Sequence, residues 1–260
     1  MTTLVTGGAG AIGRGIAAAF ADRGEHVVVA DLDLAAAEAV AADLAHASAV
    51  ALDVRDIAAW REVVDAVEGD HGPITTLVNN AGVPAVGPSH ELPYDTWRLV
   101  HDVNVMGVVN GVATVYPRLV ERGAGRIVNV ASLSAFTPVP MAVAYAASKH
   151  AVLGLSRSLR AEARQHGVQV HVLCPGFVDT PLLHDDEAGG QGLSFATIAQ
   201  ELKMPVTTVE RVVTDLMKGL DRERGVIVTP ATAKATRWLA GVLPGVSDRV
   251  TRALAPRIGR

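Results

Sequence analysis

Short runs of β-branched and other apolar residues recur along the chain, separated by Ala-rich stretches whose apolar residues repeat with helical spacing. Strands that alternate with helices are typical of βαβ units, whose right-handed crossovers build a parallel sheet covered on both faces. The pattern therefore predicts an α/β fold with one doubly wound parallel sheet of about seven strands. The expected strands lie near 2–6, 26–31, 49–52, 76–79, 126–131, 169–173 and 226–228.

Residues 1–260 contain no repeat, low-complexity tract or linker that would separate two domains, so a single domain is expected. We expect 181–221 to form a substrate loop and lid helices, since DDEAGGQG at 185–192 is typical of a mobile loop. The stretch 194–213 resembles a helix-turn-helix superficially. However, 194–221 holds three cations against four acids, whereas a recognition helix needs cations for phosphates. DNA binding by this stretch is therefore disfavoured.

Composition limits the classes of protein further. Hydrophobic residues make up 49% of the chain and aromatic residues only 4%, which favours a core of Ala, Val, Leu and Ile. The sequence has no apolar run of roughly 18–20 residues and no basic-flanked secretory signal, so a cytoplasmic location is expected. The single cysteine, Cys174, excludes an internal disulfide, is expected to be a buried structural thiol, and offers no metal cluster; no metal site is predicted.

Charge is distributed unevenly along the chain. Residues 231–260 hold six cations and one acid and carry +5, which leaves −9 on residues 1–230. The acidic body disfavours nucleic acid as a partner. The basic C-terminal extension has apolar positions that predict two short amphipathic helices. It could pack over the substrate mouth, form a subunit interface, or make peripheral contact with an anionic membrane; packing is the default expectation.

A glycine-rich turn connects the first predicted strand to the first predicted helix. Gly7 is followed by a G-x-G-x-x-G pattern at Gly8, Gly10 and Gly13. Bare backbone at a helix N-terminus lets a dinucleotide pyrophosphate approach N–H groups that side chains would obstruct. The turn therefore predicts a Rossmann-like dinucleotide site, and a tight turn without a ligand is the alternative.

Asp31, which ends the second predicted strand 18 residues after Gly13, favours NAD as the cofactor. Its carboxylate can accept hydrogen bonds from both ribose hydroxyls, whereas a 2′-phosphate would place like charges together. A role for Asp31 as a helix cap is less favoured, because Asp33 is better placed to cap the helix that follows. Asp53 and Val54 are candidate adenine contacts, although Asp53 could equally be a helix N-cap.

Six motifs occur in one order along about 175 residues: TGGAGAIG at 6–13, NNAG at 79–82, NVMG at 104–107, Ser132, YAASK at 145–149 and PGFVDT at 175–180. Together they resemble the signatures of the short-chain dehydrogenase/reductase family, in an NAD-preferring form. Ala11 departs from the usual glycine, and GVIVTPATA replaces a frequent glycine-rich ending. The resemblance implies a homodimer or homotetramer that contacts through helices near 104–122 and 143–166. It also implies cofactor contacts at Gly7, Gly10, Ile12, Gly13, Asn80, Gly82, Tyr145, Lys149, Val178 and Thr180.

Tyr145 and Lys149 are four residues apart, so on a helix they share one face and the ammonium can lie near the phenol. A phenol with a pKa near 10 is a poor base at neutral pH. A nearby cation and the positive nicotinamide would lower that pKa, which predicts Tyr145 as a general acid/base. By the resemblance, Ser132 orients the substrate oxygen, and Asn104 holds a water that connects Lys149 to solvent.

The expected reaction is the NAD-dependent interconversion of a secondary alcohol and a ketone. The candidate substrate-facing residues are mostly apolar, which predicts a lipophilic substrate, either steroid-like, terpenoid or aryl. They are Leu133, Ser134, Val139, Phe177 and Leu182. Two alternatives remain: a catalytically silent NAD-binding regulator or scaffold, and a reductase of small polar or acyl carbonyls.

Overall fold

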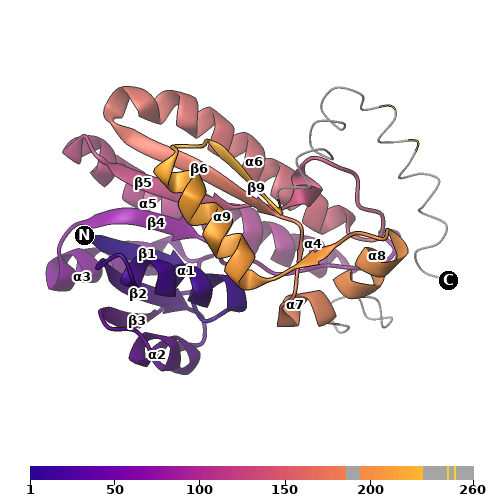
Figure 1. Cartoon of the computed structure of the whole chain (residues 1–260), viewed down its shortest axis with the longest axis horizontal. Helices are drawn as coiled ribbons and strands as arrows, with labels where there is room; N and C mark the ends of the chain where they lie inside the picture. Colours follow the sequence, from indigo (N-terminus) through magenta and orange to yellow (C-terminus); the bar gives the residue numbers. More distant parts are fainter. Residues whose placement is uncertain (186–193, 231–244, 246–248, 250–260) are drawn as a thin grey trace.

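The computed structural model describes residues 1–185, 194–230, 245 and 249. Seven parallel strands form one sheet in the order β3-β2-β1-β4-β5-β6-β9, which confirms the predicted doubly wound α/β fold (Figure 1). The strands coincide with the predicted ones to within three residues at either end. They are β1 (Thr2–Thr6), β2 (His26–Asp31), β3 (Ala47–Ala51), β4 (Ile74–Asn79), β5 (Gly125–Val130), β6 (Val168–Pro175) and β9 (Val226–Thr229).

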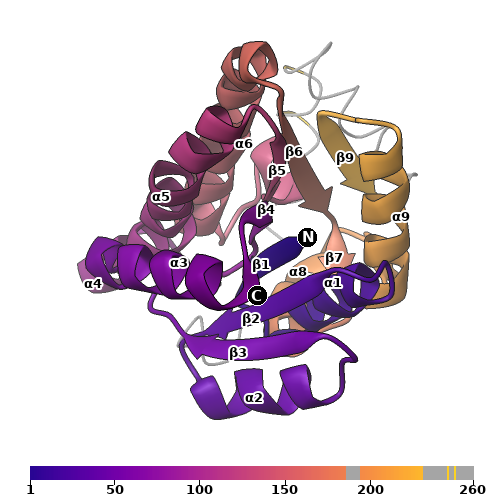
Figure 2. The same ribbon diagram turned by 90° about the vertical axis from the view of Figure 1, so that its left-hand side faces the viewer.

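Helices cover both faces of the sheet, as the turned view in Figure 2 shows. Along β1, Val5 belongs to the core on one face of the sheet, and Leu4 belongs to the core on the other face. This alternation follows from the two-residue period of a strand with both faces buried. The helices are α1 (Ala11–Ala21), α2 (Leu34–Ala42), α3 (Ile57–His71), α4 (Tyr94–His101), α5 (Gly107–Arg122), α6 (Val143–Ala163), α7 (Pro181–His184), α8 (Phe195–Glu201) and α9 (Val209–Asp221).

The strand order reverses between β1 and β4, the two central strands that start the two halves of the sheet. Helices leave these strands toward opposite faces, so a crevice opens at their carboxyl ends. The glycine-rich turn follows β1, and Asn80 follows β4, at that same edge. The topology therefore places the sequence motifs around one crevice.

Two short strands that the hydrophobic pattern did not predict tie the substrate loop at its base. β7 (Phe177–Val178) pairs in parallel with β8 (Val206–Thr207), and Asp179 N donates to Thr207 O at 2.9 Å. α9 packs on α1, where Val209 and Val213 face Gly15, because its apolar stripe completes the sheet-covering layer. The substrate-loop and lid role expected for 181–221 stays a prediction. The helix-turn-helix resemblance is thus broken by a strand.

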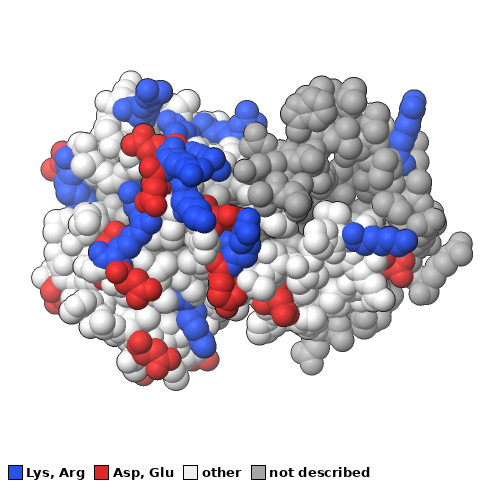
Figure 3. All heavy atoms as spheres, viewed as in Figure 1, with Lys and Arg blue, Asp and Glu red and all other residues white. Residues whose placement is uncertain are grey.

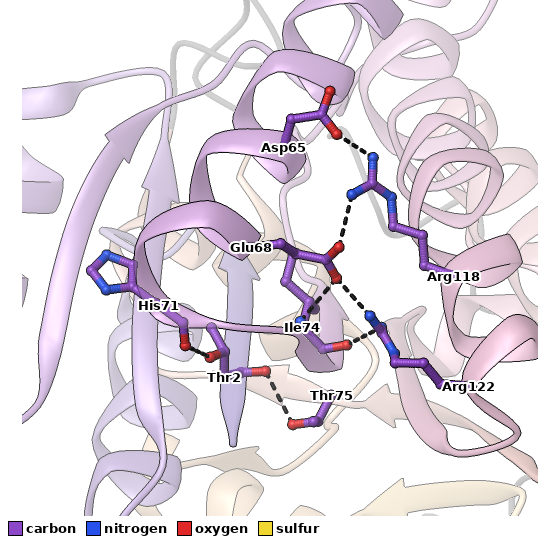
Figure 4. A network of polar contacts seen from close by, with 8 residues as sticks. All are labelled: Thr2, Asp65, Glu68, His71, Ile74, Thr75, Arg118 and Arg122. Carbon is purple, nitrogen blue, oxygen red and sulfur yellow. Dashed lines mark hydrogen bonds and ion pairs between the residues drawn. The ribbon is translucent and has the colours of Figure 1, made fainter.

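A charged network braces α3, α5 and the start of β4 (Figure 4). Glu68 accepts from Arg118 and from Arg122 at 2.8 Å each, and also from Ile74 N at 3.0 Å. Arg118 also pairs with Asp65. Burial alone would raise the pKa of Glu68, but the two guanidinium groups outweigh it and lower that pKa. The network is a structural brace remote from the crevice.

Figure 3 shows Lys and Arg interleaved with Asp and Glu over the surface around α1 and α9. Arg23 pairs there with Asp221, and Arg211 with Asp215. Across the described residues, every helix is too short or too polar to cross a membrane. The segment 186–193 and nearly all of the C-terminal extension lie outside the described residues, so the three alternatives for that extension remain predictions.

Candidate active site

One cavity of about 570 Å³ lies at the carboxyl edge of the sheet. It runs from the glycine-rich turn, past Ser132, Tyr145 and Lys149, to apolar residues of the substrate loop. Of the sequence-predicted site residues, the structure brings the following into its wall: Gly7, Gly10, Ile12, Asn80, Gly82, Ser132, Leu133, Ser134, Val139, Tyr145, Lys149, Phe177, Val178, Thr180 and Leu182. The volume falls within the usual range of small-molecule and cofactor sites.

The glycines of the turn have two distinct functions. Gly7 has φ +59°, and a Cβ on Gly13 would lie 2.1 Å from Gly7 O, so both are needed for the turn itself. A Cβ on Gly10 would meet only Gly7 O, at 3.4 Å, in the open cavity. Gly10 precedes the first residue of α1, whose first-turn N–H groups have no acceptor inside the helix. This open, positively polarised end fits a dinucleotide pyrophosphate.

Asp31 is joined to the glycine-rich turn, since its Oδ2 accepts from Ala9 N at 3.0 Å. Its Oδ1 accepts from Asp33 N at 3.3 Å, and Asp33 caps α2 as expected. Asp31, Asp53 and Val54 all lie outside the residues that line the cavity, and the adenine contacts expected of Asp53 and Val54 stay a prediction. Asp53 pairs with Arg55 at 2.6 Å, and the N-cap of α3 is Asp56 instead. Val54 is buried against Gly107.

Asn80 and Gly82 connect the end of β4 to the two halves of the site. Asn80 Nδ2 donates to Gly7 O at 2.9 Å and to Thr6 O at 3.1 Å, which holds the glycine-rich turn against β4. A Cβ on Gly82 would lie 3.2 Å from Asn104 Oδ1 and 3.3 Å from Lys149 Nζ. Gly82 therefore allows the loop to pass close to Lys149.

Tyr145 and Lys149 lie on one face of α6, as their spacing predicts. Lys149 Nζ lies 5.5 Å from the centre of the Tyr145 ring and donates to Val130 O at 3.1 Å. The lysine is buried, and the tyrosine is partly exposed on the cavity side. The ring of Phe195 packs edge-on against Tyr145, with 5.0 Å between centroids. The geometry directs a phenol and an ammonium toward the same enclosed space.

Desolvation dominates the electrostatics of this pair. Burial raises the pKa of Tyr145 to about 12, and the Ser132 hydrogen bond opposes this. Burial lowers the pKa of Lys149 to about 8, and neighbouring Cys174 opposes this. In the protein alone, desolvation therefore sets the direction of the Tyr145 pKa, and the lowering expected with nicotinamide bound stays a prediction. A phenolate at neutral pH requires a further positive charge in the cavity.

Ser132 follows β5 and caps a short 3₁₀ turn, η2 (Leu133–Ala135). Its Oγ accepts from Ser134 N at 3.1 Å and hydrogen-bonds to Tyr145. Because a backbone N–H occupies one lone pair, the serine hydroxyl is held beside the phenol in a fixed orientation. This arrangement can position an oxygen for proton transfer.

Asn104 lies in a π-helical turn, η1 (Asp102–Met106), and is fully buried. Its Oδ1 accepts from Val83 N at 2.8 Å, and its Nδ2 donates to Val83 O and to Ser148 Oγ, each at 3.0 Å. Ser148 Oγ in turn donates to Tyr145 O at 2.7 Å. The Asn104 side chain thus positions α6 against the loop that follows β4. The water relay expected for Asn104 stays a prediction.

The apolar end of the cavity includes residues that the sequence reasoning did not single out. Phe195, Leu202 and Met204 line it, along with Thr137 and Leu183. Phe195, Ile198, Ala199 and Leu202 recur at i, i+3, i+4 and i+7, and this helical stripe is the signal that could have identified α8 as a cavity wall. Thr180 Oγ1 donates to Val178 O at 3.2 Å at the base of the loop.

A doubly wound sheet with an open glycine-rich turn and a Tyr–Lys–Ser set in one cavity wall defines a dinucleotide-dependent oxidoreductase. The sequence profile of the family described as short chain dehydrogenase matches residues 1–190, and the chain belongs to that family. It is therefore an oxidoreductase of this family.

Three similar proteins illustrate the range of the family. The chain is 42% identical over 187 residues to 1-deoxy-11-beta-hydroxypentalenate dehydrogenase of Streptomyces exfoliatus, which covers 69% of this chain and 68% of the relative. It is 40% identical over 194 residues to D-threitol dehydrogenase of Mycolicibacterium smegmatis, and the match covers 73% of this chain and 74% of that relative. A Burkholderia phymatum short chain dehydrogenase/reductase, solved in complex with NAD, superposes with a TM-score of 0.81 at 30% identity over 92% of each chain.

Proposed function

We propose that this protein is an NAD-dependent oxidoreductase that interconverts a lipophilic secondary alcohol and its ketone, with Tyr145 as the general acid/base. The observation that carries the proposal is the single cavity, in which the glycine-rich turn, the Tyr145–Lys149–Ser132 set and an apolar wall are continuous. A silent binding protein would need the first of these features but neither of the other two.

The residues that would hold NAD are those at the glycine-rich end. Gly7, Gly10 and Ile12 would hold the pyrophosphate, Asp31 and Asn80 the riboses, and Val178 and Thr180 the nicotinamide amide. When bound, NAD supplies a hydride acceptor and a positive charge on its ring. That charge would lower the pKa of Tyr145, which burial raises, because a cation in a desolvated cavity favours the phenolate.

Proton transfer is assigned to the chain's own residues. On oxidation, Tyr145 takes the proton of the carbinol oxygen, and on reduction it returns that proton. Ser132 orients the oxygen and stabilises the charge that develops on it. Lys149 stabilises the phenolate from across the ring face, 5.5 Å from its centre. Asn104 acts indirectly, by holding α6 in register through Ser148.

Phe177, Phe195 and Leu202 support a lipophilic substrate, since they face the cavity beyond Tyr145. The relative named for pentalenate has a substrate of this class. The relative named for D-threitol favours a second candidate, a small polyol, and the two are separated by comparing kcat/KM for aryl or terpenoid carbinols with that for tetritols.

The acid/base assignment is tested with Tyr145→Phe, using Tyr94→Phe as the matched control because Tyr94 is an exposed phenol outside the cavity. Tyr145→Phe should lower kcat about 10²–10⁴-fold, the usual contribution of a positioned acid/base. NADH binding, followed by nicotinamide fluorescence, should persist, and Tyr94→Phe should match the wild type. Turnover that survives Tyr145→Phe would overturn the assignment.

The cofactor preference is tested by comparing NADH and NADPH affinities. Asp31→Asn removes the charge but keeps an acceptor for Ala9 N, so the turn should remain intact. The wild type should bind NADH at least tenfold more tightly, and Asp31→Asn should shift the ratio toward NADPH by about tenfold, or ~1.4 kcal/mol. Tighter NADPH binding by the wild type would overturn the role of Asp31.

A further inference from the structure

Two histidines and a serine from three different elements meet at the amino edge of the sheet, at the opposite edge from the cavity. His26 begins β2, His71 ends α3, and Ser48 lies in β3. His26 Nε2 lies 3.1 Å and His71 Nε2 lies 3.2 Å from the same atom, Ser48 Oγ. The two rings stack with 4.0 Å between their centroids and 26° between their planes. Two imidazole nitrogens therefore face one point.

The register of the sheet brings these side chains together. Val28 pairs with Ser48, and His26 lies two residues before Val28, so the two-residue period of a strand directs His26 and Ser48 to one face. α3 packs on that face and ends there with His71. The backbone oxygen of His71 accepts from Thr2 Oγ1 at 2.8 Å, and its ring points away from the neighbouring charged network (Figure 4). The cluster is thus held by pairing and packing around it.

The spacing of the three polar atoms resembles that of ligands around a metal ion. The Ser48 hydroxyl has one proton, so it can donate to only one Nε2 atom, and the other ring must donate its own N–H. A cation at this point would instead accept the lone pairs of both nitrogens. Ligand atoms that bind tetrahedral zinc at about 2.0–2.1 Å lie about 3.3 Å apart. The distances of 3.1 and 3.2 Å are close to this value.

The cluster is accessible and its imidazoles can act as ligands. His26 and Ser48 are half-buried and His71 is exposed, so an ion can enter from solvent and water can complete its coordination. Burial, and then His71 and His46, lower the pKa of His26 from 6.5, which keeps this imidazole neutral at neutral pH, as a ligand must be. Among the described residues, no group of three or more His, Cys, Asp or Glu side chains could hold a metal ion. The protein would therefore supply two nitrogens and one hydroxyl.

We propose that His26, His71 and Ser48 form a binding site for Zn²⁺ or a similar divalent cation that prefers imidazole, with water as the remaining ligands. Imidazole suits Zn²⁺, whereas Mg²⁺ prefers oxygen ligands and keeps several of its own waters. A bound ion joins the end of α3 to β2 and β3, so it stabilises the folded chain. The three residues lie outside the cavity wall, and the inference is independent of the proposed function.

The test is a zinc titration of the full-length chain, produced without a histidine tag and stripped with a chelator. Calorimetry at neutral pH should show one Zn²⁺ bound per chain, and Zn²⁺ but not Mg²⁺ should raise the melting temperature. His26→Gln and His71→Gln should each weaken zinc binding at least about tenfold, since even the loss of an outer-shell partner commonly costs that much. His90→Gln, at an exposed histidine outside the cluster, should match the wild type.

Melting curves recorded without metal show that each variant is folded, and either histidine variant alone is sufficient for the comparison. Zinc binding that survives in both histidine variants would place the ion elsewhere and overturn the inference. A wild type that zinc neither binds nor stabilises would do the same. Binding should also weaken as the pH falls below about 6.5, because protons compete for the imidazole lone pairs. Affinity that stays constant through this range would exclude imidazole ligands.

Discussion

The Lys149 ammonium lies 5.5 Å from the centre of the Tyr145 ring, in a site where burial lowers the pKa of the lysine to about 8. The lysine is thus held close to the phenol at a cost to stability. A charged group whose pKa falls on folding is less favourable in the folded state, by about 1.4 kcal/mol per pKa unit. The activity and the stability of this protein therefore oppose each other at Lys149.

Lys149→Met should abolish turnover and stabilise the protein. At pH 7, the gain in unfolding free energy should be about 1–2 kcal/mol, because relief of the buried charge exceeds loss of the hydrogen bond to Val130 O. The penalty is fully present below the folded pKa of about 8 and vanishes above the unfolded value of 10.5, so the gain should shrink as the pH rises through this window. Urea unfolding at several pH values checks this. A variant that is less stable at pH 7 contradicts it.

Gly13→Ala and Gly10→Ala should separate folding from cofactor binding. A methyl at residue 13 would lie 2.1 Å from Gly7 O, so the turn must distort. We therefore expect the free energy of unfolding to fall by about 2–4 kcal/mol. A methyl at residue 10 meets only Gly7 O, at 3.4 Å, and projects into the cavity. Gly10→Ala should fold with nearly wild-type stability and bind NADH at least tenfold more weakly. Equal melting temperatures for the two variants would contradict this account.

His171 should make the protein sensitive to acid. Its side chain is fully buried in β6, and burial lowers the pKa of His171 to about 4 from 6.5. Arg126 and Arg160 lower it as well, and Glu223 and the Arg224 carbonyl oppose them. The stability contributed by neutral His171 is fully present above pH 6.5 and is lost as the pH falls toward 4, by about 3 kcal/mol.

His171→Gln keeps a donor for Arg224 O, which lies 2.8 Å from His171 Nδ1, but cannot titrate. Its unfolding free energy should therefore fall less steeply between pH 6.5 and 4 than that of the wild type. The exposed His90 provides the control, since His90→Gln should reproduce the wild-type slope. Parallel curves for all three proteins would show that another group governs the acid response.

Glu68→Gln should weaken the brace in Figure 4 without affecting catalysis. The Glu68 side chain is 18% exposed and binds two arginines, so its neutralisation should lower the free energy of unfolding by about 1–3 kcal/mol. Asp65→Asn, at a carboxylate that is 67% exposed, should cost less than about 1 kcal/mol. Neither residue lines the cavity, so kcat should stay within about twofold. Equal destabilisation by both substitutions would contradict the difference in burial.

Features that depend on short stretches of chain could be predicted before the fold was known. Strand and helix order follow from the spacing of apolar residues, and the confirmed sheet is the direct result. Asp33 caps α2 because a carboxylate before a helix meets its free N–H groups. Tyr145 and Lys149 share a face because four residues make about one helical turn.

Contacts between distant segments could not be read in this way. Phe195 packs on Tyr145 from 50 residues further along, and α9 packs on α1 through Val209 and Val213. Burial raises the pKa of Tyr145 in the protein alone, because the number of atoms that exclude water from the phenol depends on the assembled fold. Periodicity and local chemistry set the elements and their caps. Packing and desolvation arise only when those elements meet in space.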